Sequence, residues 1–298
     1  MAARVVEAPH PISIGSTLGA LHRGKGDPTM RVARDEVVRA SRTPDGPVAA
    51  RFTGTDGRIE VQAFGPGAGW LLRRGDAWCG ALDDDSGFDP APGLVRDLWR
   101  RRRGMRIPRT GLVTERLIPV ILEQKVTGLE ARRAYRRLVL ALGEPAPGPF
   151  GLTLPPDPAR VAALPYHAFH PFGVERRRAQ VLRAACARAA WLDAAADLPL
   201  DQARARIGSL HGIGPWSVAE VAQVALGDAD AVSVGDFHLK HLVAWALARE
   251  PRGTDERMLE LLEPYRPHRG RVQRLLEGSG IRTPAFGPRT EVRAMDRL

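Results

Sequence analysis

Hydrophobic and polar side chains alternate in two short segments near the N-terminus, residues 48–53 and 58–64. Alternation with a period of two is typical of strands that bury one face. Turn-forming residues flank both segments, with Pro44-Asp45-Gly46-Pro47 before the first and Thr55-Asp56-Gly57 between them. The pattern therefore predicts a β-rich N-terminal domain over residues 1–90.

Further along the chain, apolar residues recur at helical spacing. Thr114 is a candidate N-cap for a helix that continues past Val139, and Gly143 follows as a stop signal. A proline-rich loop begins at Pro145, and Asp157-Pro158 then supplies the cap and first residue of a short helix. Further helices are predicted over residues 175–192, 201–207, 215–226, 236–248, 255–263 and 267–277.

Together the two patterns predict an α+β fold in three parts. An acidic segment, residues 83–87, and the prolines Pro90 and Pro92 have the composition of a linker. We therefore place a domain boundary near residue 90. A mostly helical region is expected over residues 91–280, and a C-terminal tail over residues 281–298.

The chain has 298 residues, with 44 Lys and Arg against 34 Asp and Glu, a net charge of +10. Only three of the cations are lysines, which coding bias toward arginine explains without any anionic partner. The charge is nevertheless unevenly placed, because residues 1–90 hold 11 cations and 12 anions, whereas residues 91–298 hold 33 and 22. This asymmetry favours a polyanion partner for the helical region.

Several classes of protein are excluded by the same sequence. No apolar run reaches the ~18 residues of a membrane-spanning helix, and no signal core follows Met1, so we expect a cytoplasmic protein without a membrane partner. The two cysteines, Cys79 and Cys186, are too few for a disulfide framework or an iron–sulfur cluster. Two histidine pairs, 167/170 and 238/241, have a spacing that a metal could use, but neither is accompanied by the further ligands that a metal site requires.

The segment Leu210-His211-Gly212-Ile213-Gly214 lies between two predicted helices. Its glycines allow a sharp turn and close approach of the backbone N–H groups to a phosphate. Pro215 suits the first position of the next helix, whose N-terminus favours an anion. A helix–hairpin–helix that binds DNA backbone and an ordinary turn between helices are both compatible with this pattern.

Asp236 lies about twenty residues further on, where an apolar stretch enters another helix. Such a residue is commonly only an N-cap. The two roles are compatible, because a helix N-terminus also stabilises an ionised carboxylate. A carboxylate is what a reaction through a cationic transition state requires.

The hairpin followed by Asp236 resembles the helix–hairpin–helix DNA glycosylases, and most closely the subgroup of DNA-3-methyladenine glycosylase II. Residues 121–127 are similar to a helix of that family, and residues 264–269 to its Arg-Pro-rich segment. The resemblance covers roughly residues 10–280. It implies a double-stranded DNA partner that contains a damaged base, flipping of that base out of the stack, and a nucleoid-associated monomer.

This resemblance implies roles for individual residues of the chain. Asp236 is the expected catalytic residue, which stabilises the sugar cation and activates water. The residues expected to contact the substrate base are Trp216, Glu220, Phe237, Gln124 and Lys125. The residues expected to bind DNA are Leu210, Gly212, Ile213, Gly214, Lys240, Arg176, Arg177 and Arg178. Strand-cleaving relatives have a lysine where this chain has Trp216, which implies no lyase activity, and the lack of cysteines after Cys186 implies no iron–sulfur cluster or other cofactor.

Two of these positions depart from the family pattern. Glu220 stands where the family has a pocket aromatic, and Lys125 where it has an apolar wedge. Ser217, Glu220 and Gln223 can form a plain solvent-exposed stripe, or they can face a base that is recognised by hydrogen bonds. We therefore expect a monofunctional glycosylase that removes damaged, alkylated bases in base excision repair. The alternative is a lesion-binding protein of the same fold that is non-catalytic or has shifted specificity.

Overall fold

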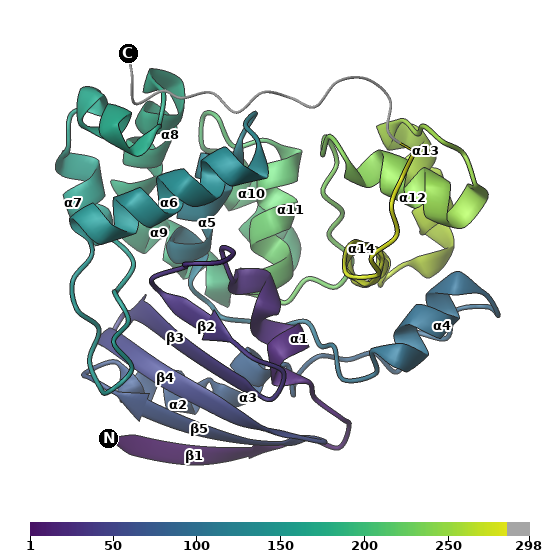
Figure 1. Ribbon diagram of the computed structural model, residues 1–298, viewed down its shortest axis with the longest axis horizontal. Helices are drawn as coiled ribbons and strands as arrows, with labels where there is room; N and C mark the ends of the chain where they lie inside the picture. The colour runs from purple at the N-terminus through teal and green to yellow at the C-terminus, as the bar shows by residue number, and fades with distance from the viewer. Residues whose placement is uncertain (285–298) are drawn as a thin grey trace.

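The computed structural model describes residues 1–284, and an antiparallel sheet of five strands forms its base (Figure 1). The strand order is β1-β5-β4-β3-β2. The strands are β1 Ala2–Glu7, β2 Met30–Val32, β3 Glu36–Thr43, β4 Gly46–Thr55 and β5 Arg58–Phe64. The predicted strands at 48–53 and 58–64 are thus confirmed. Asp56 and Gly57 form the turn between them with φ of 52° and 87°, as a tight hairpin requires.

Apolar side chains of the sheet form a core with three short helices. Phe52 stacks on Trp78, with ring centroids 5.9 Å apart. The helices of this core are α1 Ile14–Leu18, α2 Ala68–Arg73 and α3 Gly75–Cys79. The predicted proline-rich loop covers another part of the sheet, where Leu152 and Leu154 pack against Val38. Both faces of the sheet are therefore partly covered.

Above the sheet in Figure 1 lies a first helical core. Its elements are α5 Val113–Glu123, α6 Gly128–Leu142, α7 Pro158–Ala163, α8 Arg176–Cys186, α9 Ala189–Asp193, α10 Leu200–Gly208 and α11 Pro215–Val221. A single π-helical turn, Ala222–Leu226, extends α11. Asp157 caps α7 as predicted, accepting a hydrogen bond of 2.8 Å from the Ala159 N–H group.

A second helical core lies beside the first and takes its helices from two separate parts of the chain (Figure 1). Its elements are α4 Leu94–Arg101, α12 Leu239–Ala248, α13 Asp255–Leu262 and α14 Arg269–Glu277. Within the described residues, the helical region thus contains two cores. The domain boundary near residue 90 stays a prediction, and most of the predicted tail lies outside the described residues.

The prediction of one long helix that begins at Thr114 is wrong in two respects. It is divided into α5 and α6, because Thr127 caps α6 in a reciprocal capping box with Glu130. Thr114 is also not its cap, since the Asp193 carboxylate accepts the Thr114 N–H hydrogen bond at 2.7 Å. The helix predicted over residues 175–192 likewise consists of two helices, α8 and α9.

The acidic segment 83–87 does not behave as a free linker. Asp83 is paired with Arg271 of α14 through two hydrogen bonds of 2.8 Å, and both side chains are buried. Asp85 is paired with Arg106 at 2.7 Å. The segment therefore attaches the N-terminal part of the chain, which forms the sheet, to the second helical core.

Part of the positive charge of the helical region lies inside the protein. Arg106, Arg116, Arg178, Arg271 and Arg274 are all buried. Their charges serve the fold, so the surplus after residue 90 overstates the charge that is exposed to a partner. Among residues 1–284, no helix is both long and apolar enough to cross a membrane.

Candidate functional site

The hairpin between α10 and α11 forms as its sequence predicts. The Ile213 N–H group donates to the Leu210 carbonyl at 3.0 Å, which closes the turn. The Leu210 and Ile213 side chains are buried in the first helical core. Gly214 and Pro215 are exposed, so the turn presents its backbone to solvent at the start of α11. Leu210 and Ile213 thus hold the hairpin through apolar side chains.

The two hairpin glycines differ in whether the fold requires them. Gly212 has a φ of +86°, and a Cβ atom placed there would lie 2.4 Å from the Val181 side chain of α8. Both observations exclude a larger residue. Gly214 has a φ of −100°, and a Cβ atom there would meet nothing within 4 Å. Packing within the protein therefore does not demand a glycine at position 214.

Gln124 connects the hairpin to the loop between α5 and α6. Its side-chain amide donates to the Gly212 carbonyl at 2.9 Å and to the Ser217 hydroxyl at 3.0 Å. The next residue, Lys125, is exposed and has a φ of +54°. Gln124 therefore positions the hairpin and the loop that bears Lys125, a role that its placement among base-contacting residues did not predict.

Asp236 is held by donors from two elements. Its Oδ1 accepts hydrogen bonds of 2.8 Å from the N–H groups of His238 and Leu239, at the start of α12. Its Oδ2 accepts a hydrogen bond of 3.1 Å from the indole Nε1 of Trp216, on the first turn of α11. The Asp236 carboxylate thus accepts hydrogen bonds from the N–H groups at the start of α12, whose N-cap position is His238, and Trp216 joins Asp236 to the helix that follows the hairpin.

Glu220 lies in a polar network between the two helical cores. The Ser233 hydroxyl donates to one carboxylate oxygen at 2.7 Å, and Arg116 forms an ion pair with the other at 2.8 Å. Loss of hydration raises the pKa of Glu220, while the Ser233 hydrogen bond lowers it. The interpretation of a solvent-exposed stripe is wrong, because Ser217 and Gln223 are buried.

The same network continues to the end of α14. Gln273 and Ser233 bind each other reciprocally, at 3.0 Å and 3.1 Å, and the Gln273 amide also donates to Glu277 at 3.0 Å. We refer to Glu220, Ser233, Gln273 and Glu277 as the acidic network. Sequence reasoning missed Ser233 and Gln273 because only tertiary contacts, across 40 residues, bring them together.

The remaining predicted residues occupy different environments. Phe237 is 72% exposed and has an edge-to-face contact with His238, so it does not enclose a cavity in this structure. Lys240 lies 3.7 Å from Asp255. Arg176 lies over the Tyr166 ring on the surface, and Arg177 is exposed.

The structure corrects the prediction that Arg178 binds DNA. It is 4% exposed, and its guanidinium donates to the Leu122 carbonyl at 2.8 Å near the end of α5. Successive helical residues differ by about 100° in direction, so three adjacent arginines cannot share one face. Arg178 serves the packing of α8 against α5.

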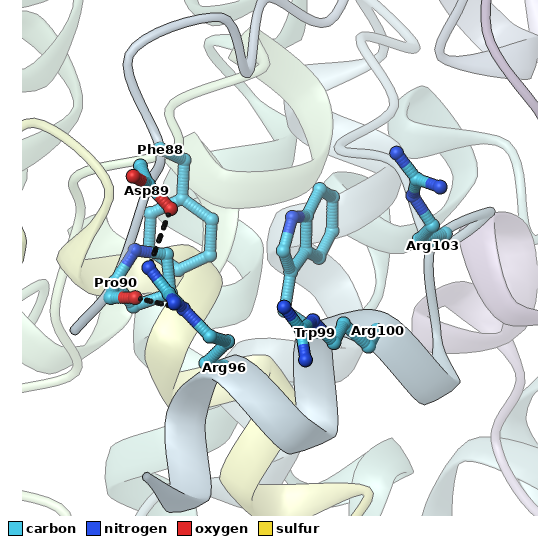
Figure 2. Close-up of a pocket in the computed structure, with 7 residues that line it drawn as sticks. All are labelled: Phe88, Asp89, Pro90, Arg96, Trp99, Arg100 and Arg103. Carbon is cyan, nitrogen blue, oxygen red and sulfur yellow. Dashed lines mark hydrogen bonds and ion pairs between the residues drawn. The ribbon is translucent and has the colours of Figure 1, made fainter. Parts of the chain in front are cut away.

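A separate arginine-rich hollow of about 690 Å³ lies on α4 (Figure 2). Its lining residues are Phe88, Asp89, Pro90, Arg96, Trp99, Arg100 and Arg103. Arg96 is occupied by hydrogen bonds to Asp89 and to the Pro90 carbonyl. None of the lining residues belongs to the hairpin or the acidic network. Over residues 1–284 no group of three or more His, Cys, Asp or Glu is arranged to hold a metal ion.

We compared the sequence and the fold with those of known proteins. No family model matches the chain. The chain is 30% identical over 163 residues to the "Probable bifunctional transcriptional activator/DNA repair enzyme AlkA" of two Mycobacterium tuberculosis strains. That alignment covers 54% of this chain and 32% of the relative, so the chain spans about a third of the length of these curated relatives.

Solved structures are similar over almost the whole chain. The 3-methyladenine DNA glycosylase from Archaeoglobus fulgidus has a TM-score of 0.76 at 18% identity, covering 92% of this chain and 97% of that one. MBOgg1, solved in complex with a low-affinity DNA ligand, has a TM-score of 0.67 at 15% identity, with 93% and 97% covered. The chain therefore has the fold of the helix–hairpin–helix DNA glycosylases, and the expected α+β class is confirmed.

Proposed function

We propose that the protein is a monofunctional DNA glycosylase that hydrolyses the N-glycosidic bond of a damaged, alkylated base in base excision repair. The observation that carries this proposal is the hydrogen bond between Trp216 and Asp236. It joins a carboxylate to the helix that begins at the exposed turn of the hairpin. The relative from Mycobacterium tuberculosis, named as a DNA repair enzyme, supports the same activity.

The proposed partner is double-stranded DNA that contains the damaged base. The exposed backbone at Gly214 would bind a phosphate beside the lesion, and the exposed arginines Arg176 and Arg177 would add salt-dependent affinity. The damaged nucleotide leaves the stack to reach Asp236. This contact set has no sequence preference, as a repair enzyme that searches a genome requires.

Asp236 would then act on the sugar. As the base leaves, positive charge develops on the ring, and a carboxylate ~4 Å away stabilises it by about 4 kcal/mol at an effective dielectric near 20. The same carboxylate aligns water on the side opposite the leaving base and accepts its proton. The three donors that hold Asp236 fix its orientation before the substrate binds.

Trp216 supports the absence of lyase activity. Cleavage of the strand through a Schiff base requires an amine nucleophile. The chain has only Lys25, Lys125 and Lys240, and the position that follows the hairpin is occupied by an indole. Borohydride trapping of the protein on abasic DNA would contradict this part of the proposal.

The decisive experiment compares Asp236→Asn with the wild type on duplexes that carry 3- or 7-methylpurines, scored as alkali-labile sites. We expect loss of excision by several hundredfold with lesion binding retained. Asp201→Asn is the matched control, because Asp201 is exposed on α10 and paired only with its neighbour Arg204 among the described residues. Excision by Asp236→Asn at the wild-type rate would reject the catalytic assignment.

The second candidate is a lesion-binding protein without glycosylase activity. Glu220 and Lys125 favour it, because both stand where related glycosylases use apolar or aromatic residues. Tight binding to lesion duplexes by the wild type, with no abasic product from any of them, would select this candidate over the first.

A further inference from the structure

One segment of the chain passes from the first helical core to the second and carries Asp236 at its end. This crossing segment comprises residues 228–236, between the π-helical turn that extends α11 and the start of α12. Ala231 packs in the first core, whereas Val232 and Val234 pack against the second. The place of Asp236 relative to the hairpin therefore depends on how the crossing segment is held between the two cores.

Ser233 is the residue of the crossing segment at which contacts from both cores meet. Its hydroxyl donates to Glu220 of α11 at 2.7 Å and accepts from the Gln273 amide of α14 at 3.1 Å. Its backbone N–H group donates to the Gln273 side-chain oxygen at 3.0 Å, and its carbonyl accepts from the Asp236 N–H group at 3.1 Å. Ser233 is buried, and each of its polar groups thus has a protein partner.

The helix that follows the hairpin, α11, contacts both ends of the turn from Ser233 to Asp236. Trp216 donates to the Asp236 carboxylate at 3.1 Å, and Glu220, one helical turn further on, accepts from Ser233. Residues four positions apart lie on the same face of a helix, so a single face of α11 fixes both ends of the turn. The hydrogen bond from the Asp236 N–H group to the Ser233 carbonyl closes the turn itself. A shift of Ser233 would therefore move the backbone of Asp236 relative to the hairpin.

The two partners of the Ser233 side chain are themselves fixed. Glu220 forms an ion pair of 2.8 Å with Arg116 of α5, whose buried guanidinium also donates to the Glu220 carbonyl at 3.0 Å. Gln273 is buried within α14. A side chain that is locked by packing and by its own hydrogen bonds can hold another residue in place, whereas a mobile one would follow it. Ser233 is thus attached to a fixed point in each helical core.

We propose that Ser233 is a positioning residue of the glycosylase site, which together with Glu220 and Gln273 sets the place of Asp236 relative to the hairpin. This inference rests on the proposed function. A phosphate bound at the hairpin fixes the damaged nucleotide relative to α11, and Ser233 fixes the Asp236 backbone relative to the same helix. A displacement of about 1 Å at a catalytic group can cost about a hundredfold in rate, even when the substituted residue lies away from the reacting atoms. Ser233 is buried, so it acts through Asp236 and not through a contact with DNA.

The first variant, Ser233→Ala, removes only the hydroxyl group. Glu220 keeps its Arg116 partner, and the N–H and carbonyl groups of residue 233 keep theirs. On duplexes that carry 7-methylguanine, we expect the maximal single-turnover rate to fall about tenfold to a hundredfold. The protein concentration that gives half of that rate should stay within about twofold of the wild-type value, because no contact with DNA is lost.

A second variant approaches the same turn from the other core. Gln273→Met retains the side-chain volume, and it removes both the donor to the Ser233 hydroxyl and the acceptor of the Ser233 N–H group. The loss of rate should therefore be at least as large as for Ser233→Ala, again with an unchanged half-saturating concentration. Unfolding temperatures show whether each variant is folded.

Repeating Ser233→Ala in an Asp236→Asn background separates positioning from general damage to the protein. If Ser233 acts only through the Asp236 carboxylate, the residual rate of Asp236→Asn should fall by less than about twofold on adding Ser233→Ala. A further fall of about tenfold in this background would overturn the proposal, because Ser233 would then act on something other than Asp236.

Ser41→Ala is the matched control. Ser41 and Ser233 are each 1% exposed, and the Ser41 hydroxyl likewise donates to a glutamate, Glu115, at 2.9 Å and accepts from Arg39 at 3.1 Å. Ser41 lies in β3, so its substitution should lower the unfolding temperature about as much as Ser233→Ala does and leave excision at the wild-type rate. Excision by folded Ser233→Ala at the wild-type rate would overturn the inference and leave the proposed function intact. A wild type that excises no damaged base would reject the proposed function, and this inference with it.

Discussion

Gln124 of the loop between α5 and α6 donates a hydrogen bond to the Gly212 carbonyl in the middle of the hairpin, at 2.9 Å. The same amide donates to Ser217 on the first turns of α11. One side chain thus fixes two surface loops relative to each other.

Replacing Gln124 with Leu should therefore weaken DNA binding and lower stability by comparable free energies. The substitution removes both hydrogen bonds and leaves the Ser217 hydroxyl without this partner, at a cost of about 1–3 kcal/mol in unfolding free energy. Affinity for an abasic duplex, measured by fluorescence anisotropy, should fall by about tenfold. Gln202→Leu, a change at an exposed position of α10, is the control. Unchanged affinity would show that the two loops do not act together.

Substituting the two hairpin glycines one at a time separates effects on folding from effects on DNA binding. Gly212→Ala should destabilise the protein by several kcal/mol, because the new Cβ atom would meet Val181 at 2.4 Å and the residue would retain a positive φ. Gly214→Ala should change the unfolding free energy by less than about 1 kcal/mol. Urea denaturation of both variants checks these expectations.

If the backbone at position 214 approaches a phosphate, Gly214→Ala should nevertheless weaken DNA binding. The methyl group would occupy the open space beside the turn, where a phosphate oxygen would lie. A stable Gly214→Ala variant that binds DNA with wild-type affinity would show that the hairpin is only a turn between helices.

The three adjacent arginines at the start of α8 should behave unequally. Replacing Arg176 and Arg177 with Ser should lower DNA affinity and reduce the slope of log K against log salt by about 1 for every phosphate that is no longer bound. Arg178→Met should instead lower the unfolding free energy, because it removes the buried donor to the Leu122 carbonyl. A salt titration and a denaturation curve separate the two effects. Equal salt slopes for the wild type and the double variant would rule out phosphate binding at these two positions.

Local features were predictable from the sequence, and the reason is their short range. The strands at residues 48–64 are joined by an Asp-Gly turn, and the hairpin is a run of five residues. Asp236 accepts hydrogen bonds from N–H groups two and three residues further on, at the start of α12, so the local pattern sufficed. Each of these depends on residues within a few positions of one another.

Contacts across long sequence separations were not predictable. At the start of α5, the hydrogen-bond acceptor is the Asp193 carboxylate and not the Thr114 side chain. Asp193 accepts from the Thr114 N–H group, which lies 79 residues earlier in the sequence. For Glu220, the sequence left both a solvent-exposed stripe and a base-facing position open, because a polar residue on a helix is usually exposed. The partial burial of Glu220 brings it against Arg116 and Ser233, which periodicity within one helix does not reveal.

Trp216→Phe should slow excision without abolishing lesion binding. The change removes only the indole N–H that donates to Asp236, and the capping hydrogen bonds from His238 and Leu239 remain. A hydrogen bond to a charged group is worth about 1.5–3 kcal/mol, so we expect a loss of about tenfold to a hundredfold in single-turnover rate. Trp245→Phe on α12 is the matched control. An unchanged rate for Trp216→Phe would mean that the start of α12 alone orients the carboxylate.

The buried pair of Asp83 and Arg271 should be a major contribution to the attachment of the second helical core. Asp83→Asn leaves a fully buried guanidinium without its countercharge, so we expect the unfolding free energy to fall by about 3–5 kcal/mol. Asp89→Asn is the control, since Asp89 is largely exposed in its pair with Arg96 and should cost less than about 1 kcal/mol. Adding Arg271→Met to Asp83→Asn should recover part of the loss, because it removes the uncompensated charge. A double variant less stable than Asp83→Asn alone would show that Arg271 stabilises the core through its packing against Phe88 and Trp99 and not through the ion pair.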